Sequence, residues 1–400
     1  MLKKLLIFTL ILSIFCTTCI NVFASEDETI SDNEINNGAD LDFTTTTSLE
    51  IQAKSAVLMD AETGTVLYSS MPNQELPLAS VTKIMSLLIV CEALEDGRIR
   101  LDENVMVSSN ASGMGGSQIF LKEGEIFTVE ELIKSTVIAS ANDAIVALAE
   151  HIYGSESVFV ERMNEKAVEL GMKNSMFENC TGLDDTTTKH FSSAYDIALM
   201  SRELIKRDII LKYSNVWQDS IRDGQFILTN TNRLVRYYDG CTGLKTGSTD
   251  KAGFCLSATA NRGGLHLIAV VMGSESRDKR NETARAMLDY GFSGYAIYKD
   301  NARIVDNREV RFGRVDDVDL HTNGFTKLVD KANIKNVEIK YELPEYIEAP
   351  LKKGDVVGKI TYYINDEKIG QSDIYIDSEI ERIGVFEIIY RIIMSILIGK

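Results

Sequence analysis

An apolar segment from Ile84 to Leu94 places the strongest constraint on how this chain can fold. Its apolar side chains recur on nearly every side of a helix instead of forming one stripe, which is typical of a helix buried inside a domain core. Gly97 is expected to end this helix. The chain must therefore supply enough structure to enclose a whole helix, and its 400 residues, 44% of them hydrophobic, are sufficient for that.

Ser80 and Lys83 stand at the polar start of this helix. They are three residues apart, so both side chains are expected to project from one face. A hydroxyl beside an amine at the positive end of a buried helix can act as an activated nucleophile. The simpler interpretation is an N-cap serine with a solvated lysine, and Ser248–Lys251 and Ser276–Lys279 repeat the same spacing. The pattern gains weight only from the motifs that accompany it.

The composition excludes several classes of function. A formal net charge of −17 argues against binding to nucleic acid and against electrostatic capture by anionic lipid. The chain has four histidines and no His-Glu-x-x-His motif, and it has no paired Cys-x-x-Cys beyond residue 24. The sequence therefore predicts neither a metal site nor a nucleic-acid partner.

The first 24 residues are predicted to be a secretory signal peptide. Lys3 and Lys4 precede the apolar run Leu5–Ile14, and Val22–Ala24 offers a small-residue cleavage site. A retained N-terminal membrane helix is the alternative. Residues 25–49 are acidic without any Lys or Arg and are predicted to form a disordered leader. We therefore expect an exported protein.

In residues 50–295, strand patterns occur near both ends and helical patterns lie between them. These segments indicate one antiparallel sheet faced by a helical cluster, an α/β domain over residues 50–295. The predicted strands are Ala56–Met59, Thr65–Tyr68, Gly243–Thr246, Gly253–Ala260 and Leu265–Met272. The predicted helices are the Ser80 helix, one that Thr128 and Glu131 open with a capping box, and further ones near 157–170, 193–205 and 282–290.

Four cysteines lie beyond the signal peptide: Cys91, Cys180, Cys241 and Cys255. Cys91 is expected to pack inside the buried helix as a small apolar group. Cys241 and Cys255 flank a predicted turn, and the sequence leaves open whether they are bonded.

The amino-acid composition changes in the C-terminal region. Residues 300–378 are rich in alternating Val, Ile and Tyr, which predicts a separate small all-β domain. Residues 379–400 predict an amphipathic helix. Its apolar run Ile383–Ile398 would span about 24 Å, less than the ~30 Å of a bilayer core, which favours a helix lying in the membrane interface. The alternative is a core helix packed on the β domain.

Two more motifs follow Ser80 along the chain. Ser140-Ala141-Asn142 comes after a predicted helix, and Lys245-Thr246-Gly247 lies on a predicted strand. Ser-x-Asn alone is weak, because Ser108-Ser109-Asn110 also fits it. The ordered set of Ser-x-x-Lys, Ser-x-Asn and Lys-Thr-Gly is highly specific.

On these motifs the sequence resembles the low-molecular-weight penicillin-binding proteins that act as D-alanyl-D-alanine carboxypeptidases, within the β-lactamase/transpeptidase-like superfamily. The resemblance runs from about residue 50 to the end, and it implies that superfamily's fold for the α/β domain. Further matching stretches are Gly116–Leu121, Ala141–Ala144, Asn179–Leu183, His190–Asp196 and Lys245–Gly253.

The chemistry assigns roles to these residues. Ser80 must lose its proton as it attacks a carbonyl, and Lys83 can take that proton only when neutral, which burial and a second cation such as Lys245 would favour. Ser140 and Asn142 suit proton relay and the positioning of the lysine and the substrate amide, and the resemblance assigns Ser140 to relay toward the leaving group.

In the third motif, Lys245 and Thr246 would hold the substrate's terminal carboxylate. Gly247 would let the substrate backbone approach the strand edge. The resemblance implies an oxyanion hole formed by the backbone N–H groups of Ser80 and Ser248.

The resulting prediction is an enzyme that removes the terminal D-alanine from peptidoglycan stem pentapeptides through a Ser80 acyl-enzyme, without metal or organic cofactor. β-Lactams would acylate the same serine. The protein would lie on the outer face of the bacterial cytoplasmic membrane, attached by its C-terminal helix.

Three alternatives remain open. A related DD-endopeptidase or transpeptidase would use the same residues. A class A β-lactamase is disfavoured because the chain lacks a Glu-x-x-Leu-Asn segment between the second and third motifs. A non-enzymatic module that binds wall peptides or β-lactams is disfavoured because every residue that the chemistry needs is present.

Overall fold

The computed structural model describes residues 49–185 and 187–398. The predicted signal peptide, and the predicted leader up to residue 48, lie outside the described residues.

A five-stranded antiparallel sheet forms the framework of the first domain, with strand order β2-β1-β9-β8-β7. Strand β1 lies between β2 and β9, and each of its six residues is buried. The pairing of β1 with β9 therefore joins the beginning and the end of the domain, as the sequence predicted. The strands are β1 (Ser55–Asp60), β2 (Val66–Ser70), β7 (Cys241–Thr249), β8 (Gly253–Arg262) and β9 (Leu265–Ser274).

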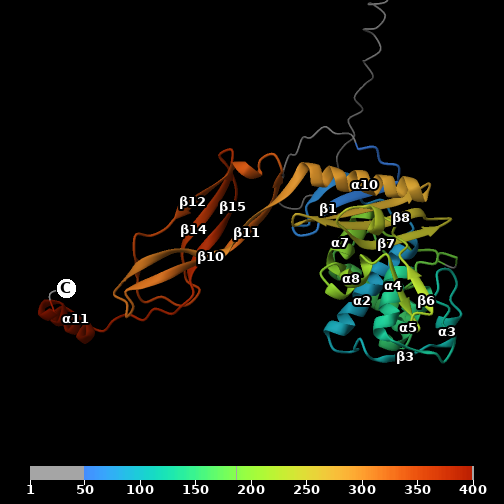
Figure 1. Cartoon of the computed structure of the whole chain (residues 1–400), viewed down its shortest axis with the longest axis horizontal. Coiled ribbons are helices and arrows are strands. Elements are labelled where there is room, and N and C mark those ends of the chain that lie inside the picture. Colours follow the sequence, from blue (N-terminus) through green and yellow to red (C-terminus); the bar gives the residue numbers. More distant parts are fainter. Residues whose placement is uncertain (1–48, 186, 399–400) are drawn as a thin grey trace, which may run out of the picture. The chain divides into compact units, whose positions relative to one another are not determined.

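Helices cover both faces of this sheet (Figure 1). Helix α10 (Arg277–Gly294) packs on one face, and α7 (Ala194–Leu204) on the other, where the helical cluster lies. The remaining elements of the cluster are α2 (Lys83–Glu95), α3 (Ser109–Ser112), α4 (Val129–Ala139), α5 (Asn142–Tyr153), α6 (Glu156–Glu169), α8 (Asp208–Ser214), α9 (Leu234–Tyr237) and the strand pairs β3 (Asn104–Met106) with β4 (Ile126–Thr128) and β5 (Gln218–Ile221) with β6 (Phe226–Thr229). The predicted antiparallel sheet with a helical cluster is confirmed.

Helix α2 is the buried helix that the sequence predicted, because ten of its thirteen residues are buried. One turn of 3₁₀ helix, η1 (Ala79–Thr82), precedes it and carries Ser80. Leu78 and Thr82 are the N-cap residues of η1 and α2, and no described side chain caps either element, so the interpretation of Ser80 as an N-cap residue is wrong. Gly97 follows the helix with φ +70°, a left-handed conformation that ends it.

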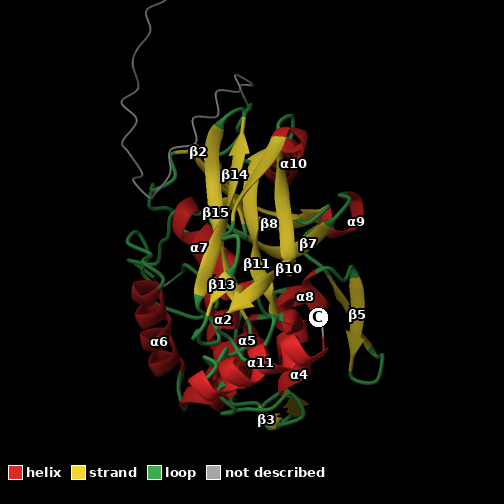
Figure 2. Ribbon diagram, turned by 90° about the vertical axis from the view of Figure 1, so that its left-hand side faces the viewer, coloured by secondary structure: helices red, strands yellow, loops and turns green. Residues whose placement is uncertain are grey.

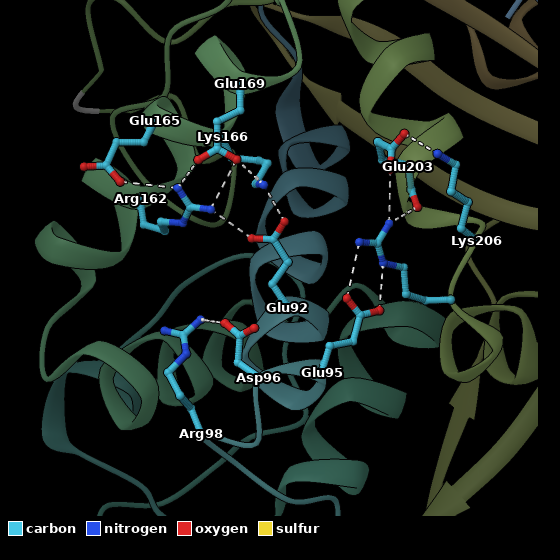
Figure 3. A network of polar contacts seen from close by, with 11 residues as sticks. Glu92, Glu95, Asp96, Arg98, Arg162, Glu165, Lys166, Glu169, Glu203 and Lys206 are labelled. Carbon is cyan, nitrogen blue, oxygen red and sulfur yellow. Dashed lines mark hydrogen bonds and ion pairs between the residues drawn. The ribbon is translucent and has the colours of Figure 1, made fainter.

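An ion-pair network fixes the far end of α2 to α6 (Figure 3). Glu92 of α2 contacts Lys166 Nζ at 2.5 Å and Arg162 Nη2 at 3.1 Å, and both cations also pair with Glu169. Glu92 and Lys166 are largely shielded from solvent, so these contacts are less screened than ordinary surface pairs.

The second domain is all β, as predicted. Its six-stranded sheet has the order β12-β14-β15-β11-β10-β13 (Figure 2). Its core includes the fully buried Leu320, Ile360, Tyr362 and Ile374. The strands are β10 (Tyr295–Arg311), β11 (Asp317–Asp330), β12 (Val337–Glu342), β13 (Ile347–Glu348), β14 (Val356–Ile364) and β15 (Glu367–Ile376), with one 3₁₀ turn, η2 (Ile334–Asn336).

The last described helix is α11 (Val385–Ile398). It starts later than the sequence predicted, because Ile380 and Arg382 form isolated β-bridges with Leu351 and Gly313. Large apolar side chains of α11 are exposed, among them Phe386 at 90%. Within residues 49–185 and 187–398, no helix combines the length and hydropathy that crossing a membrane requires.

Candidate active site

Ser80 and Lys83 meet as the sequence predicted. Lys83 Nζ lies 3.0 Å from Ser80 Oγ, and the same nitrogen donates to the carbonyl oxygen of Thr181 at 2.7 Å. Because the Thr181 carbonyl can only accept, it fixes the direction of the amine and leaves Ser80 within proton-transfer distance.

Lys83 is fully buried, and burial lowers its pKa to about 7. An appreciable fraction of Lys83 is therefore a neutral amine near neutral pH, as a general base requires. The sequence prediction named Lys245 as a second cause, but burial is the dominant one. Burial also lowers the pKa of Lys245 well below its usual value, and the charge of Lys83 lowers it further.

The junction between α4 and α5 carries the second motif. Ser140 follows α4 with φ +62°, and this left-handed residue turns the chain so that α5 can begin at Asn142. Asn142 donates from Nδ2 to the Gly115 carbonyl at 2.7 Å. Its Oδ1 is buried and has no hydrogen-bond partner among the described residues, and Asn142 is not among the residues that line the cavity described below.

Lys245 reaches the second motif from strand β7. Its Nζ donates to Ser140 Oγ at 2.8 Å and to the Thr246 carbonyl at 3.1 Å. Lys245 is buried and is not among the residues that line the cavity described below, so it lies behind Ser140. This placement differs from the expected direct grip on a carboxylate.

The structure shows a steric requirement for glycine at position 247 that the sequence did not predict. A Cβ at this position would lie 2.7 Å from the Leu78 carbonyl oxygen and 2.9 Å from the backbone nitrogen of Ser80. The glycine therefore lets strand β7 approach the turn that carries the nucleophile. Ser248 follows on the same strand and is exposed toward the cavity.

These walls enclose a cavity of about 490 Å³, within the usual range for ligand sites. Four predicted site residues line it besides Gly247: Ser80, Ser140, Thr246 and Ser248. The lining also includes residues that the sequence analysis did not select: Ser117, Trp217, Thr229, Asn230, Thr231, Arg233, Arg277 and Arg280.

A loop from another part of the chain completes the nucleophile's surroundings. Gly182 packs so closely that a Cβ there would lie 1.9 Å from the Ala79 carbonyl oxygen. Ser86 Oγ donates to the Cys180 carbonyl at 2.7 Å, next to the Thr181 carbonyl that receives Lys83. The sequence contained a signal for this contact in the stretch Asn179–Leu183, but no role was assigned to it.

The cysteines and the metal-ligating side chains form no further reactive site among the described residues. Cys91, Cys180, Cys241 and Cys255 are all free thiols, so Cys241 and Cys255 are not bonded to each other. In the described part of the chain, no group of three or more His, Cys, Asp or Glu side chains is arranged to hold a metal ion.

A serine hydroxyl beside a buried lysine, closed by a second serine and a lysine-bearing strand, defines the class of active-site-serine acyl-transfer enzymes. Two family profiles match the chain. D-alanyl-D-alanine carboxypeptidase matches residues 42–276, and the penicillin-binding protein 5 C-terminal domain matches residues 292–382. The chain belongs to the D-alanyl-D-alanine carboxypeptidase family.

Individual proteins agree with this assignment. The chain is 41% identical to D-alanyl-D-alanine carboxypeptidase DacF of Bacillus subtilis, covering 86% of this chain and 90% of that one. Penicillin-binding protein 5 of Haemophilus influenzae superposes with a TM-score of 0.70 at 30% identity, covering 84% and 99% of the two chains. Penicillin-binding protein D2 of Listeria monocytogenes, solved in its ampicillin-bound form, gives 0.57 at 28% identity, covering 62% and 99%.

Proposed function

We propose that this protein is a serine-type carboxypeptidase that releases the terminal D-alanine from peptidoglycan stem peptides ending in D-Ala-D-Ala. The observation that carries the proposal is the buried Lys83, with a pKa of about 7, whose Nζ lies 3.0 Å from Ser80 Oγ. A nucleophile and its base are thus already assembled in the protein alone.

Acylation begins when Ser80 Oγ attacks the carbonyl carbon of the penultimate D-alanine and its proton passes to neutral Lys83. Backbone N–H groups of Ser80 and Ser248 stabilise the oxyanion that forms. The C–N bond then breaks, its electron pair stays on the leaving nitrogen, and that nitrogen gains a proton through Ser140. The contact from Lys245 Nζ to Ser140 Oγ holds this hydroxyl in place.

Hydrolysis of the acyl-enzyme reverses these proton transfers. Water attacks the ester carbonyl, Lys83 accepts the water's proton, and Ser80 regains a proton as the C–O bond breaks. Asn142 would hold the substrate amide through its unpaired Oδ1, which must become accessible on binding because it is buried and Asn142 does not line the cavity. The terminal carboxylate is bound by Arg280, and by the Thr246 hydroxyl once this group turns away from Thr231.

The decisive assay is release of D-alanine from a D-Ala-D-Ala pentapeptide. Wild type is expected to release it, and Ser80→Ala is expected to lose essentially all of this activity. Absence of release by wild type rejects the carboxypeptidase, and full activity of Ser80→Ala rejects Ser80 as nucleophile. A fluorescent penicillin is expected to label wild type but not Ser80→Ala, because its strained amide places a carbonyl at the same serine.

The same assay separates the alternatives. A binding module would be acylated by penicillin without releasing D-alanine, and a β-lactamase would hydrolyse penicillin rapidly. A transpeptidase or endopeptidase is favoured if added amines or cross-linked peptides react faster than the pentapeptide.

We further propose that the protein is exported through the signal peptide at residues 1–24 and is attached to the outer face of the cytoplasmic membrane by α11. The exposed apolar side chains of this helix support the attachment. Truncation after Gly384 is the sharper test, because Ile380 and Arg382 form β-bridges within the β domain. The truncated protein is expected in the soluble fraction once signal cleavage is verified, and continued membrane attachment contradicts the anchor.

A further inference from the structure

The lining of the active-site cavity carries several positive charges. Arg233, Arg277 and Arg280 line the cavity. No Asp or Glu of residues 49–185 and 187–398 lines it, although the chain carries 59 acidic residues and a net charge of −17. One terminal carboxylate needs no more than one or two of these groups, so the cavity holds more positive charge than a D-alanine leaving group uses.

Arg280 is suited to the terminal carboxylate. Its side chain is buried, and it is held by the Asn281 side-chain oxygen and by the Cys255 carbonyl oxygen. Burial, followed by the charge of Arg277 and that of Arg233, lowers the pKa of Arg280 to about 10. The three guanidinium groups therefore repel one another, and an anion among them relieves that repulsion.

The guanidinium groups of Arg233 and Arg277 are not needed to bind the terminal carboxylate, so they can bind a second anion. Both side chains are exposed, and neither forms an ion pair or a side-chain hydrogen bond with any described residue. Asp278, next to Arg277, lines a separate cavity on the other side of Arg233 together with Glu282. The charge of Asp278 acts on Arg280 more weakly than the charges of Arg277 and Arg233 do, so the cavity wall keeps a positive excess.

Both arginines lie close along the chain to residues at the proposed carboxylate position. Thr246 Oγ1 donates to Thr231 Oγ1 at 2.7 Å, and Arg233 lies two residues further along. Asn232 fixes this segment, because its Nδ2 donates to the Gly243 carbonyl at 2.7 Å. Arg277 begins α10 three residues before Arg280, so the two side chains project from neighbouring positions on one face of the helix.

We propose that Arg233 and Arg277 form a second anion subsite that selects leaving groups carrying a carboxylate in addition to the terminal one. The leaving group is then an acidic D-amino acid, or a peptide branch with an acidic side chain, attached to the penultimate D-alanine. This inference rests on the proposed function and specifies the substrate class of the same site.

The test uses three peptides that differ only in the last residue, D-alanine, D-glutamine or D-glutamate. D-Glutamine and D-glutamate have nearly the same shape, so their ratio of kcat/KM isolates the charge. Wild type is expected to prefer D-glutamate about tenfold at low salt. Arg233→Gln and Arg277→Gln are each expected to reduce this ratio about threefold, and the double variant to bring it close to one.

Two controls separate a subsite from long-range attraction. The three peptides carry an N-terminal acetyl group, so a D-Ala-D-Gln peptide with an N-terminal succinyl group in its place has the same net charge as the D-glutamate peptide. Its extra carboxylate lies at the opposite end. A subsite predicts no comparable gain from the succinyl group. Arg285→Gln changes an exposed arginine that lines the neighbouring cavity on α10, and it is expected to retain the wild-type ratio.

Three results overturn the subsite: a wild-type ratio near one, an equal gain from the succinyl peptide, or a double variant that keeps the wild-type ratio. If wild type also fails to hydrolyse the D-Ala-D-Ala peptide in the same assay, the proposed function itself falls.

Discussion

The hydroxyl of Thr82 lies 2.7 Å from Nε2 of His190, a residue 108 positions away in the sequence. The other ring nitrogen, Nδ1, accepts a hydrogen bond from the backbone N–H of Glu178 at 3.0 Å. A backbone N–H can only donate, so Nδ1 must be unprotonated and the proton of the neutral ring must sit on Nε2. His190 therefore donates to Thr82, which stands between Ser80 and Lys83.

This contact predicts that His190 positions the catalytic turn and makes the protein sensitive to acid. Burial lowers the pKa of His190 to about 4, against about 6.5 in an unfolded chain. Between these values the unfolded state binds a proton that the folded state excludes. Stability is therefore complete above about pH 6.5 and falls as the pH drops toward 4, by up to about 3 kcal/mol.

Urea unfolding of wild type and His190→Gln between pH 4 and 7 measures this contribution. The variant is expected to be less stable at pH 7 and to lose less stability on acidification, because glutamine does not titrate. Its acylation by penicillin is expected to slow about tenfold. Parallel pH profiles for the two proteins would show that His190 does not titrate on unfolding.

Lys83 predicts the pH dependence of catalysis. Its pKa is about 7 because the amine is buried, and only its neutral form can accept the Ser80 proton. The rate of acylation by penicillin is therefore expected to rise as the pH increases through about 7 and then to level off. Lys83→Arg keeps the positive charge but cannot act as a base, so it is expected to lose at least about 10³-fold in rate.

Stopped-flow acylation from pH 5.5 to 9 measures this profile. An exposed lysine would give a rising limb near its ordinary pKa of about 10.4. A midpoint above pH 9 would contradict the assignment of Lys83 as the base in its buried, neutral form.

The parts of the site that the sequence predicted are those that carry their chemistry in a short local motif. Ser80 and Lys83 are three residues apart on one turn, so their spacing alone brings the two side chains together. Lys245 and Thr246 are consecutive on one strand, so finding one locates the other. The all-round apolar pattern of α2 likewise predicted a buried helix, because burial on every side requires apolar residues on every side.

The rest of the site depends on contacts between distant segments, which no local pattern specifies. The Thr181 carbonyl that holds Lys83 is a backbone atom, and its position does not depend on the type of its own side chain. Arg233 and Arg277 look like ordinary surface arginines in the sequence. Only the fold shows that they face one cavity and lack acidic partners among the described residues.

The close contact between Gly182 and the Ala79 carbonyl oxygen can be tested by adding a methyl group at Gly182. A Cβ at this position would lie 1.9 Å from the Ala79 carbonyl oxygen and 2.8 Å from Thr82 Oγ1, so Gly182→Ala must displace the turn that carries Ser80. We expect a loss of more than about 2 kcal/mol in stability and of at least about 100-fold in acylation rate.

Gly171→Ala is the matched control for this variant. Gly171 also has a positive φ, +73° against +83° for Gly182, but a Cβ there meets no atom within 4 Å. Gly171→Ala is therefore expected to lose about 1–2 kcal/mol of stability, because alanine is strained at a positive φ, and to keep the wild-type acylation rate. Equal behaviour of the two variants in thermal unfolding and penicillin acylation would show that backbone conformation, not the contact with Ala79, decides the outcome.

Asp143 provides the last prediction, because its carboxylate holds the loop that borders the cavity. It accepts hydrogen bonds from the backbone N–H groups of Ile119 and Leu121 at 3.0–3.2 Å. In Asp143→Asn the amide NH₂ would face one of these donors, and a buried N–H would lose its acceptor. We expect a loss of about 2–3 kcal/mol in stability and a higher KM, since the loop also carries Ser117 into the cavity lining.

Chemical unfolding and D-alanine release from the pentapeptide measure the two effects of Asp143→Asn. Asp102→Asn is the control, because this carboxylate is exposed and pairs only with Arg100, at 3.4 Å. It is expected to change stability by less than about 0.5 kcal/mol and to leave KM unaltered. If Asp143→Asn keeps the wild-type KM while losing stability, the carboxylate supports the fold without positioning the cavity wall, because a displaced loop must alter substrate binding.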